Sequence, residues 1–296
     1  MAKTKILIAI DDLDWACIIA HTLFNLINKE TSEIILLNVL ETTVAEEEVF
    51  YASPEGFIKT EARKANFAYV ENFLEKNGFK YEFIFKEGDV AKRIIETAKE
   101  FDIDVIALGS HNKKILEKLF LGSVAYKVSR GCKRSVLIIS NKVQAHEARN
   151  EFKVLLAVDG SEPAYYAAQT LHELIDAKRA NVDILNATVP PQNVIPPEAY
   201  IYTDIEKIKE EARKVSEDIL EIAAQKLEGQ EVKQINKVSV CGHISGSIIE
   251  YAEKNAIDLI VMGEHGKKNL SERILGSISA KVSEKSQIPL LLIKKK

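Results

Sequence analysis

One stretch decides the fold, and it reads Ile257-Asp258-Leu259-Ile260-Val261-Met262-Gly263-Glu264-His265-Gly266. The apolar run at 257–262 is typical of a strand that is buried in a parallel sheet. Nine residues separate Gly266 from Gly276, and a helical pattern starts at Ser277. The sequence therefore predicts a strand, a glycine turn, a loop, and a helix that begins at a further glycine.

These glycines suggest a site for an anion. Gly263 and Gly266 lack Cβ, so the backbone here can adopt positive φ and approach a ligand closely. Gly276 and Ser277 leave N–H groups at the start of a helix, where hydrogen bonds and the helix dipole both favour an anion. The arrangement suits a phosphate chain, although two glycine turns that only connect elements would produce the same pattern.

The same spacing occurs twice in the chain. Gly109 and Gly263 are 154 residues apart, and so are Gly122 and Gly276. The first strands repeat as well, because ILIAID at 6–11 matches VLLAVD at 154–159. A period near 150 residues equals one ordinary domain. We therefore predict a duplication, with domains at 1–141 and 151–296 and a polar linker at 142–150.

Composition narrows the class of protein. The chain has 296 residues, 28% of them charged, and a net charge of −4, so we expect no nucleic-acid face. Cys17, Cys132 and Cys241 are odd in number and widely spaced, which favours thiols of a reducing compartment over a disulfide frame or a metal site. No apolar segment reaches the ~20 residues that span a bilayer, and no signal peptide is predicted. We expect a cytoplasmic protein that binds no membrane.

Each half follows the order β-α-β-α-β-α-β-α-β, which predicts an α/β fold with a parallel sheet and helices on both faces. In the second half, Ser161 is the expected N-cap of a helix with Pro163 in its first turn. A long helix is predicted at 204–227, and the lysines at 294–296 are expected to be solvated. We expect the apolar stripe of this helix to lie in the core; its members are Ile205, Ile208, Ala212, Val215, Ile219 and Ile222.

In a doubly wound sheet, ligands bind outside the carboxyl ends of the strands, where the winding direction reverses. In the second half, Asp159, Ala187 and Gly263 come at such ends, and Gly276 opens the neighbouring helix. A carboxylate on one side and a phosphate cradle on the other indicate a nucleotide. Neither the GxGxxG motif nor the P-loop motif follows a first strand.

These residues resemble the universal stress proteins in their tandem two-domain form, over essentially the whole chain. The most specific element is a motif in which two residues separate the first two glycines and nine residues separate the second from a Gly-Ser pair. In this chain it is formed by Gly263, Gly266, Gly276 and Ser277. The sequence Asp159-Gly160-Ser161, after the first strand, accompanies it. The resemblance implies five-stranded sheets of order 3-2-1-4-5 and bound ATP or AMP, with or without Mg²⁺. It implies adenosine against Ala157, Val158, Asp159 and Ala187, ribose against Met262 and Gly263, and phosphates against His265, Gly266, Gly276, Ser277, Ile278 and Ser279.

The resemblance also implies pairing of the fifth strands, at 135–139 and 289–293. Within one chain this pairing would form a pseudo-dimer of the two halves, and a homodimer is the alternative.

The first half departs from the family pattern. The matching positions of a weaker second site are Asp11, Val39, Gly109, His111, Asn112, Gly122, Ser123 and Val124. Asn112 replaces the second glycine, and Asp12 adds a carboxylate where the second half has Gly160. A like charge 4 Å from a phosphate costs about 1 kcal/mol in water and about 4 kcal/mol at an effective dielectric of 20. We expect nucleotide mainly in the second half.

Several alternatives remain open at this point. His111 and His265 could contact phosphate, bind a metal or only stabilise a turn, while Glu264 is expected at a solvated rim. The leading hypothesis is a nucleotide-binding stress regulator without catalytic residues; a slow ATPase and a ligand-free scaffold are the alternatives. Asp11-Asp12 also suggests a phospho-receiver, but the third strand, FIFK at 83–86, lacks the aspartate that a receiver needs.

Overall fold

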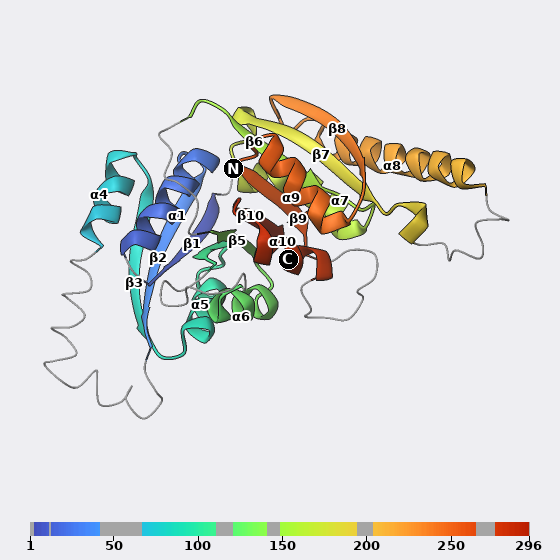
Figure 1. Cartoon of the computed structure of the whole chain (residues 1–296). Helices are drawn as coiled ribbons and strands as arrows, with labels where there is room; N and C mark the ends of the chain where they lie inside the picture. The colour runs from blue at the N-terminus through green and yellow to red at the C-terminus, as the bar shows by residue number, and fades with distance from the viewer. Residues whose placement is uncertain are drawn as a thin grey trace, which may run out of the picture. The chain divides into compact units, whose positions relative to one another are not determined.

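The computed structural model describes residues 3–11, 13–41, 67–110, 121–140, 149–193, 204–264 and 276–295. The chain divides into two compact units, Met1–Arg149 and Asn150–Lys295 (Figure 1). Each unit is an α/β domain with its own parallel sheet, as predicted.

The elements of the first unit follow the expected alternation. They are β1 (Thr4–Ile10), α1 (Leu13–Leu26), β2 (Ser32–Leu40), α4 (Ala68–Lys76), β3 (Lys80–Glu87), α5 (Val90–Glu100), β4 (Val105–Gly109), α6 (Ser123–Gly131) and β5 (Ser135–Ile139). The strands pair in parallel in the order β3-β2-β1-β4-β5. Helix α1 packs beside α4 and helix α5 beside α6, so the two pairs cover opposite faces of the sheet (Figure 1).

The second unit repeats this architecture. Its elements are β6 (Phe152–Ala157), α7 (Glu162–Leu174), η1 (Ala177–Arg179), β7 (Ala180–Thr188), η2 (Pro191–Asn193), α8 (Ile205–Leu227), β8 (Gln234–Cys241), α9 (Ile244–Lys254), β9 (Leu259–Gly263), α10 (Ser277–Lys285) and β10 (Leu290–Ile293). The strands are parallel in the order β8-β7-β6-β9-β10. Both units therefore have the order 3-2-1-4-5, which confirms the prediction.

The central strands are buried on both faces, which explains why their sequences are continuous runs of apolar residues. In β6, residues 154–156 are fully buried, and so are residues 259–261 of β9, because helices cover both faces. Ala157 of β6 lies beside Leu185 of β7 and Met262 of β9. The carboxyl ends of these three strands thus meet at the winding reversal, which is where the candidate site lies.

The helix α8 corrects one prediction. It spans the expected residues and begins after its N-cap Asp204, whose carboxylate accepts a hydrogen bond from Lys207 N–H at 3.0 Å. The stripe predicted for the core is wrong in part, because Val215 is 54% exposed and Ile222 41% exposed. The buried face is instead Ser216, Ile219, Leu220, Ala223 and Leu227.

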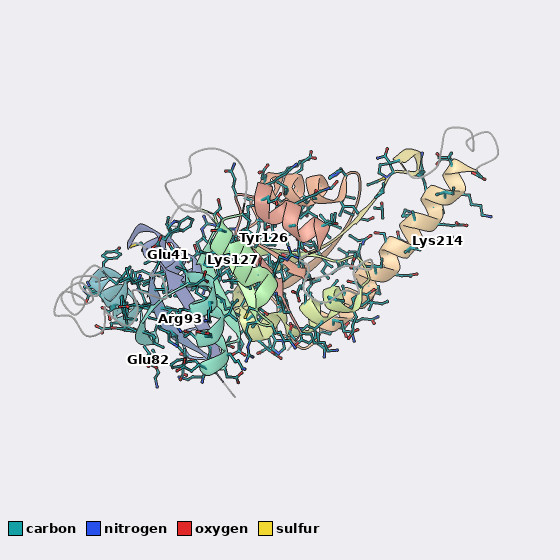
Figure 2. The ribbon with its side chains drawn as sticks, turned by 90° about the horizontal axis from the view of Figure 1, so that it is seen from below. Glu41, Glu82, Arg93, Tyr126, Lys127 and Lys214 are labelled. Carbon is teal, nitrogen blue, oxygen red and sulfur yellow. The ribbon has the colours of Figure 1, made fainter. Side chains whose placement is uncertain are left out.

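The first half of α8 extends past the sheet, and the labelled Lys214 lies on this part (Figure 2). The ion pairs of Arg213 with Glu210 at 3.0 Å and Glu217 at 3.2 Å support a helix here without a core contact. Among the described residues, no helix combines the length and the apolar character needed to cross a membrane.

Candidate functional site

The turn that follows β6 forms one side of the candidate site. Val158 N–H donates to Leu185 O at 2.9 Å, and the carboxylate of Asp159 accepts from Ser161 N–H at 3.0 Å. Gly160 has a φ of +79°, which explains the need for glycine at this position. The Asp159 carboxylate is thus held at the sheet edge by its own turn.

Helix α7 starts directly after this turn, as predicted. Ser161 is its N-cap, and the hydroxyl oxygen accepts from Ala164 N–H at 3.4 Å, with Pro163 in the first turn. Burial raises the pKa of the Tyr165 phenol, and the carboxylates of Asp159 and Asp218 raise it further. Tyr165 is therefore a neutral neighbour of Asp159 at physiological pH.

A buried amide links the ends of the first two strands in each unit. Asn186 Nδ2 donates to Val158 O at 2.7 Å, and Asn38 Nδ2 donates to Ile10 O at 2.8 Å. The side-chain oxygen of each amide is buried and has no hydrogen-bond partner among the residues that the structure describes. Sequence reasoning assigned no role to these residues, although LLN at 36–38 and ILN at 184–186 were recognisable as a repeat.

Gly263 ends β9 on the other side of the site, and the structure gives it a role in packing. The positive φ that glycine permits is not used here. A Cβ at this position would lie 2.6 Å from the carbonyl carbon and oxygen of Pro163, and 2.9 Å from the nitrogen of Ala164. Glycine is required because the first turn of α7 lies directly on it. Gly266 lies outside the described residues.

Glu264 links the end of β9 to the end of β10 and to the start of α10. Its N–H donates to Ile293 O at 3.0 Å, and its carbonyl oxygen accepts from Gly276 N–H at 3.2 Å. Its carboxylate lies 2.7 Å from Lys294 Nζ, and the two side chains are 21% and 1% exposed. The prediction of a solvated Lys294 is therefore wrong, whereas Glu264 is partly exposed, as expected at a rim. The register of β10 beside β9, with Ile293 opposite Gly263, brings the buried ammonium to this carboxylate.

Helix α10 begins beside Glu264. Its N-cap is Gly276, with φ −54° and ψ 141°. A glycine N-cap has no side-chain oxygen for the first turn, so the backbone N–H groups of this helix start are the donors that it offers to an anion. Ser279 is buried, and its hydroxyl lies 3.5 Å from Gly263 O.

The structure gathers most of the predicted site residues at the carboxyl edge of the second sheet. Ala157, Val158 and Asp159 end or follow β6, Ala187 lies near the end of β7, Met262 and Gly263 end β9, and Gly276, Ser277, Ile278 and Ser279 start α10. In the first unit, Asp11, Val39, Gly109, Gly122, Ser123 and Val124 take the matching places. His111, Asn112 and His265 lie outside the described residues.

The comparisons with known proteins agree on one family. A sequence model described as "Universal stress protein family" matches residues 3–140 and 152–294. The universal stress protein YxiE of Bacillus subtilis is 31% identical over 150 residues, which are 48% of this chain and 98% of that protein. Universal stress protein Slr1230 of Synechocystis is 29% identical over 194 residues, which are 64% of this chain and 58% of that protein.

A solved structure has the same architecture over the full length. The crystal structure of a universal stress protein from Archaeoglobus fulgidus matches with a TM-score of 0.64 at 22% identity, and the match covers 99% of this chain and 98% of that one. At this level of identity the likeness shows the fold.

Proposed function

The chain belongs to the universal stress protein family, and we propose from this premise that its second unit binds an adenine nucleotide, ATP or AMP. The protein would act in a stress response without chemistry of its own, because the bound nucleotide selects a conformation or a partner. None of the three cysteines forms a disulfide, which supports the cytoplasm as the compartment.

One observation carries the proposal. The winding reversal of the second sheet lies between a carboxylate held in place, that of Asp159, and a helix start with a glycine N-cap, that of α10. A carboxylate accepts hydrogen bonds from sugar hydroxyls, and the N–H groups of a helix start favour phosphate. The groups therefore fit a ligand with a hydroxylated sugar at one end and an anion at the other.

The proposed contacts follow this polarity. Adenosine would lie against Ala157, Val158, Asp159 and Ala187, and ribose against Met262 and Gly263. The phosphates would lie against Gly276, Ser277, Ile278 and Ser279, together with His265 and Gly266. A triphosphate would bring its Mg²⁺ along as a counter-ion. The ion pair of Glu264 with Lys294 supports this assignment, because it fixes the residue directly before the proposed phosphate contact His265.

A slow ATPase is the second candidate function. Hydrolysis needs a positioned water, a base and usually a ligand for Mg²⁺. Asp159 is the candidate carboxylate for the base or the Mg²⁺ ligand. Its side chain already accepts a hydrogen bond from Ser161 N–H within its own turn. We therefore favour a regulator. ATP turnover that exceeds that of a Gly266→Trp variant by tenfold or more would favour the enzyme instead.

From the family resemblance alone, we propose that residues 135–139 and 289–293 pair within one chain as a pseudo-dimer. A homodimer is the alternative, and sedimentation velocity separates a species of one chain mass from one of two.

Calorimetric titration with ATP and AMP tests the nucleotide proposal, and the duplication provides a matched control. Asp159→Asn keeps an oxygen for Ser161 N–H but removes the charge, while Asp11→Asn makes the same change in the first unit. Loss of one charge-assisted hydrogen bond is worth roughly 1.5–3 kcal/mol, so Asp159→Asn should weaken binding by about tenfold or more. Asp11→Asn should leave the affinity unchanged. No heat of binding at millimolar nucleotide, or the reverse ranking of the two variants, would refute the proposal.

A further inference from the structure

An aromatic side chain lies at the winding reversal of the first unit. Trp15, in the first turn of α1, is only 5% exposed. A Cβ at Gly109, the last residue of β4, would lie 2.7 Å from Cε3, 2.8 Å from Cδ2 and 2.9 Å from Cζ3 of its indole ring. The ring therefore rests on the glycine that ends β4, between this strand and the start of α1.

The second unit is built differently at the same point. Pro163 is 148 residues after Trp15 and matches it in the repeat. There the atoms nearest to a Cβ at Gly263 belong to the backbone of Pro163 and Ala164, at 2.6 and 2.9 Å. The helix start touches the strand end directly in the second unit, whereas an indole ring separates the two in the first.

The other side of the first cleft matches the second unit closely. Helix α6 starts after the N-cap Gly122, whose φ of −55° and ψ of 150° resemble those of Gly276. Gly122 N–H donates to Ser110 O at 2.6 Å, as Gly276 N–H does to Glu264 O. The helix start on the phosphate side therefore has the same form in both units, although Ser110 stands where the second unit has Glu264 and its ion pair with Lys294. A further difference lies where α1 meets β4.

We infer that Trp15 closes the cleft of the first unit and so limits the chain to one nucleotide site. The inference rests on the proposed function of the second unit. The indole occupies the junction of α1 and β4, which in the second unit would border the ribose. This closure is steric and acts on the neutral nucleoside as much as on its phosphates, unlike the charge repulsion expected from Asp12.

Adenosine is the probe that separates these two effects, because it carries no charge. The full chain should bind one adenosine per chain by calorimetry. Trp15→Pro introduces the residue of the second unit, and proline is tolerated in the first turn of a helix. We expect this variant to bind two per chain. Trp15→Phe keeps an aromatic ring in place and should still bind one.

Trp15 is the single tryptophan of the chain, so its fluorescence reports on this cleft alone. In the unmodified protein, adenosine should bind without shifting the emission maximum. A shift to the red during binding would mean that the ligand displaces the indole from the first cleft, and it would overturn the inference.

Folding of Trp15→Pro is checked by circular dichroism, and Trp15→Ala serves as a second variant because it leaves the helix start unchanged. If a folded variant of either kind still binds one adenosine while the unmodified chain also binds one, the inference fails and the proposed function stands. If the unmodified chain binds none and the variant binds one, Trp15 does close the first cleft, but the proposed function of the second unit fails and the limit of one site fails with it. If neither binds any, both fail.

Discussion

Gly263→Ala tests whether this glycine serves helix packing or ligand approach. The added Cβ would lie 2.6 Å from two backbone atoms of Pro163 and 2.9 Å from the nitrogen of Ala164. Carbon atoms pack best at about 3.5–4.0 Å, so the first turn of α7 would have to retreat by roughly 1 Å. These atoms are backbone, which cannot rotate away as a flexible side chain can.

The expected cost follows from this overlap. Overpacking a tight interior costs about 1–3 kcal/mol, and we expect Gly263→Ala to lose this amount of unfolding free energy. In Gly109→Ala of the first unit, the three atoms nearest to the added Cβ belong to the Trp15 ring, at 2.7–2.9 Å, so a turn of the indole can relieve part of the overlap. Its cost should be smaller.

Gly246→Ala is the control for the method. Gly246 lies in helix α9, and a Cβ there would lie at an ordinary 3.5 Å from His243 Nδ1. Alanine in place of a helical glycine should gain about 0.5–1 kcal/mol. Urea unfolding ranks the three variants, and hydrogen exchange should locate the effect of Gly263→Ala in α7 and β9.

The packing argument would be refuted by a Gly263→Ala variant that is as stable as the unmodified protein but binds ATP more weakly. Such a result would mean that Gly263 is needed for close approach of the backbone to a ligand, the role that the sequence suggests.

Three further predictions concern polar groups that are buried or partly buried. Glu264→Gln removes the carboxylate that lies 2.7 Å from the Lys294 ammonium, which is 1% exposed, and should cost about 3 kcal/mol in urea unfolding; Lys294→Met should cost less, and equal costs would contradict the argument. Asn186→Asp places a carboxyl against Val158 O, where only the protonated form can donate a hydrogen bond. The variant should therefore lose stability as pH rises from about 5 to about 7, whereas a pH-independent loss would exclude this reason. Burial lowers the pKa of His21, so the folded state favours the neutral ring and stability should fall as pH drops through the ordinary histidine range. In His21→Gln, the change in unfolding free energy between about pH 7.5 and about pH 5.5 should be smaller; an unchanged slope would assign it to other groups.

The sequence by itself determined the two α/β units and the place of the candidate site. Apolar runs at 6–10, 154–158 and 257–262 predict strands that are covered on both faces, and the spacing of 148 to 154 residues shows the duplication. Local chemistry was equally readable, since Ser161 caps α7 as expected. These features depend on neighbours in the chain, which a sequence displays directly.

Only the tertiary structure decided which distant atoms meet. Gly263 is glycine because of Pro163, which precedes it by 100 residues, and Lys294 is buried because β10 lies beside β9. The exposure of Val215 could likewise not be predicted from the helical periodicity of the sequence. Periodicity shows which side chains share a face of a helix but not what covers that face. The closing of the first cleft by Trp15 belongs to the same class: an indole in the first turn of a helix acquires its role only when folding sets it on the end of β4.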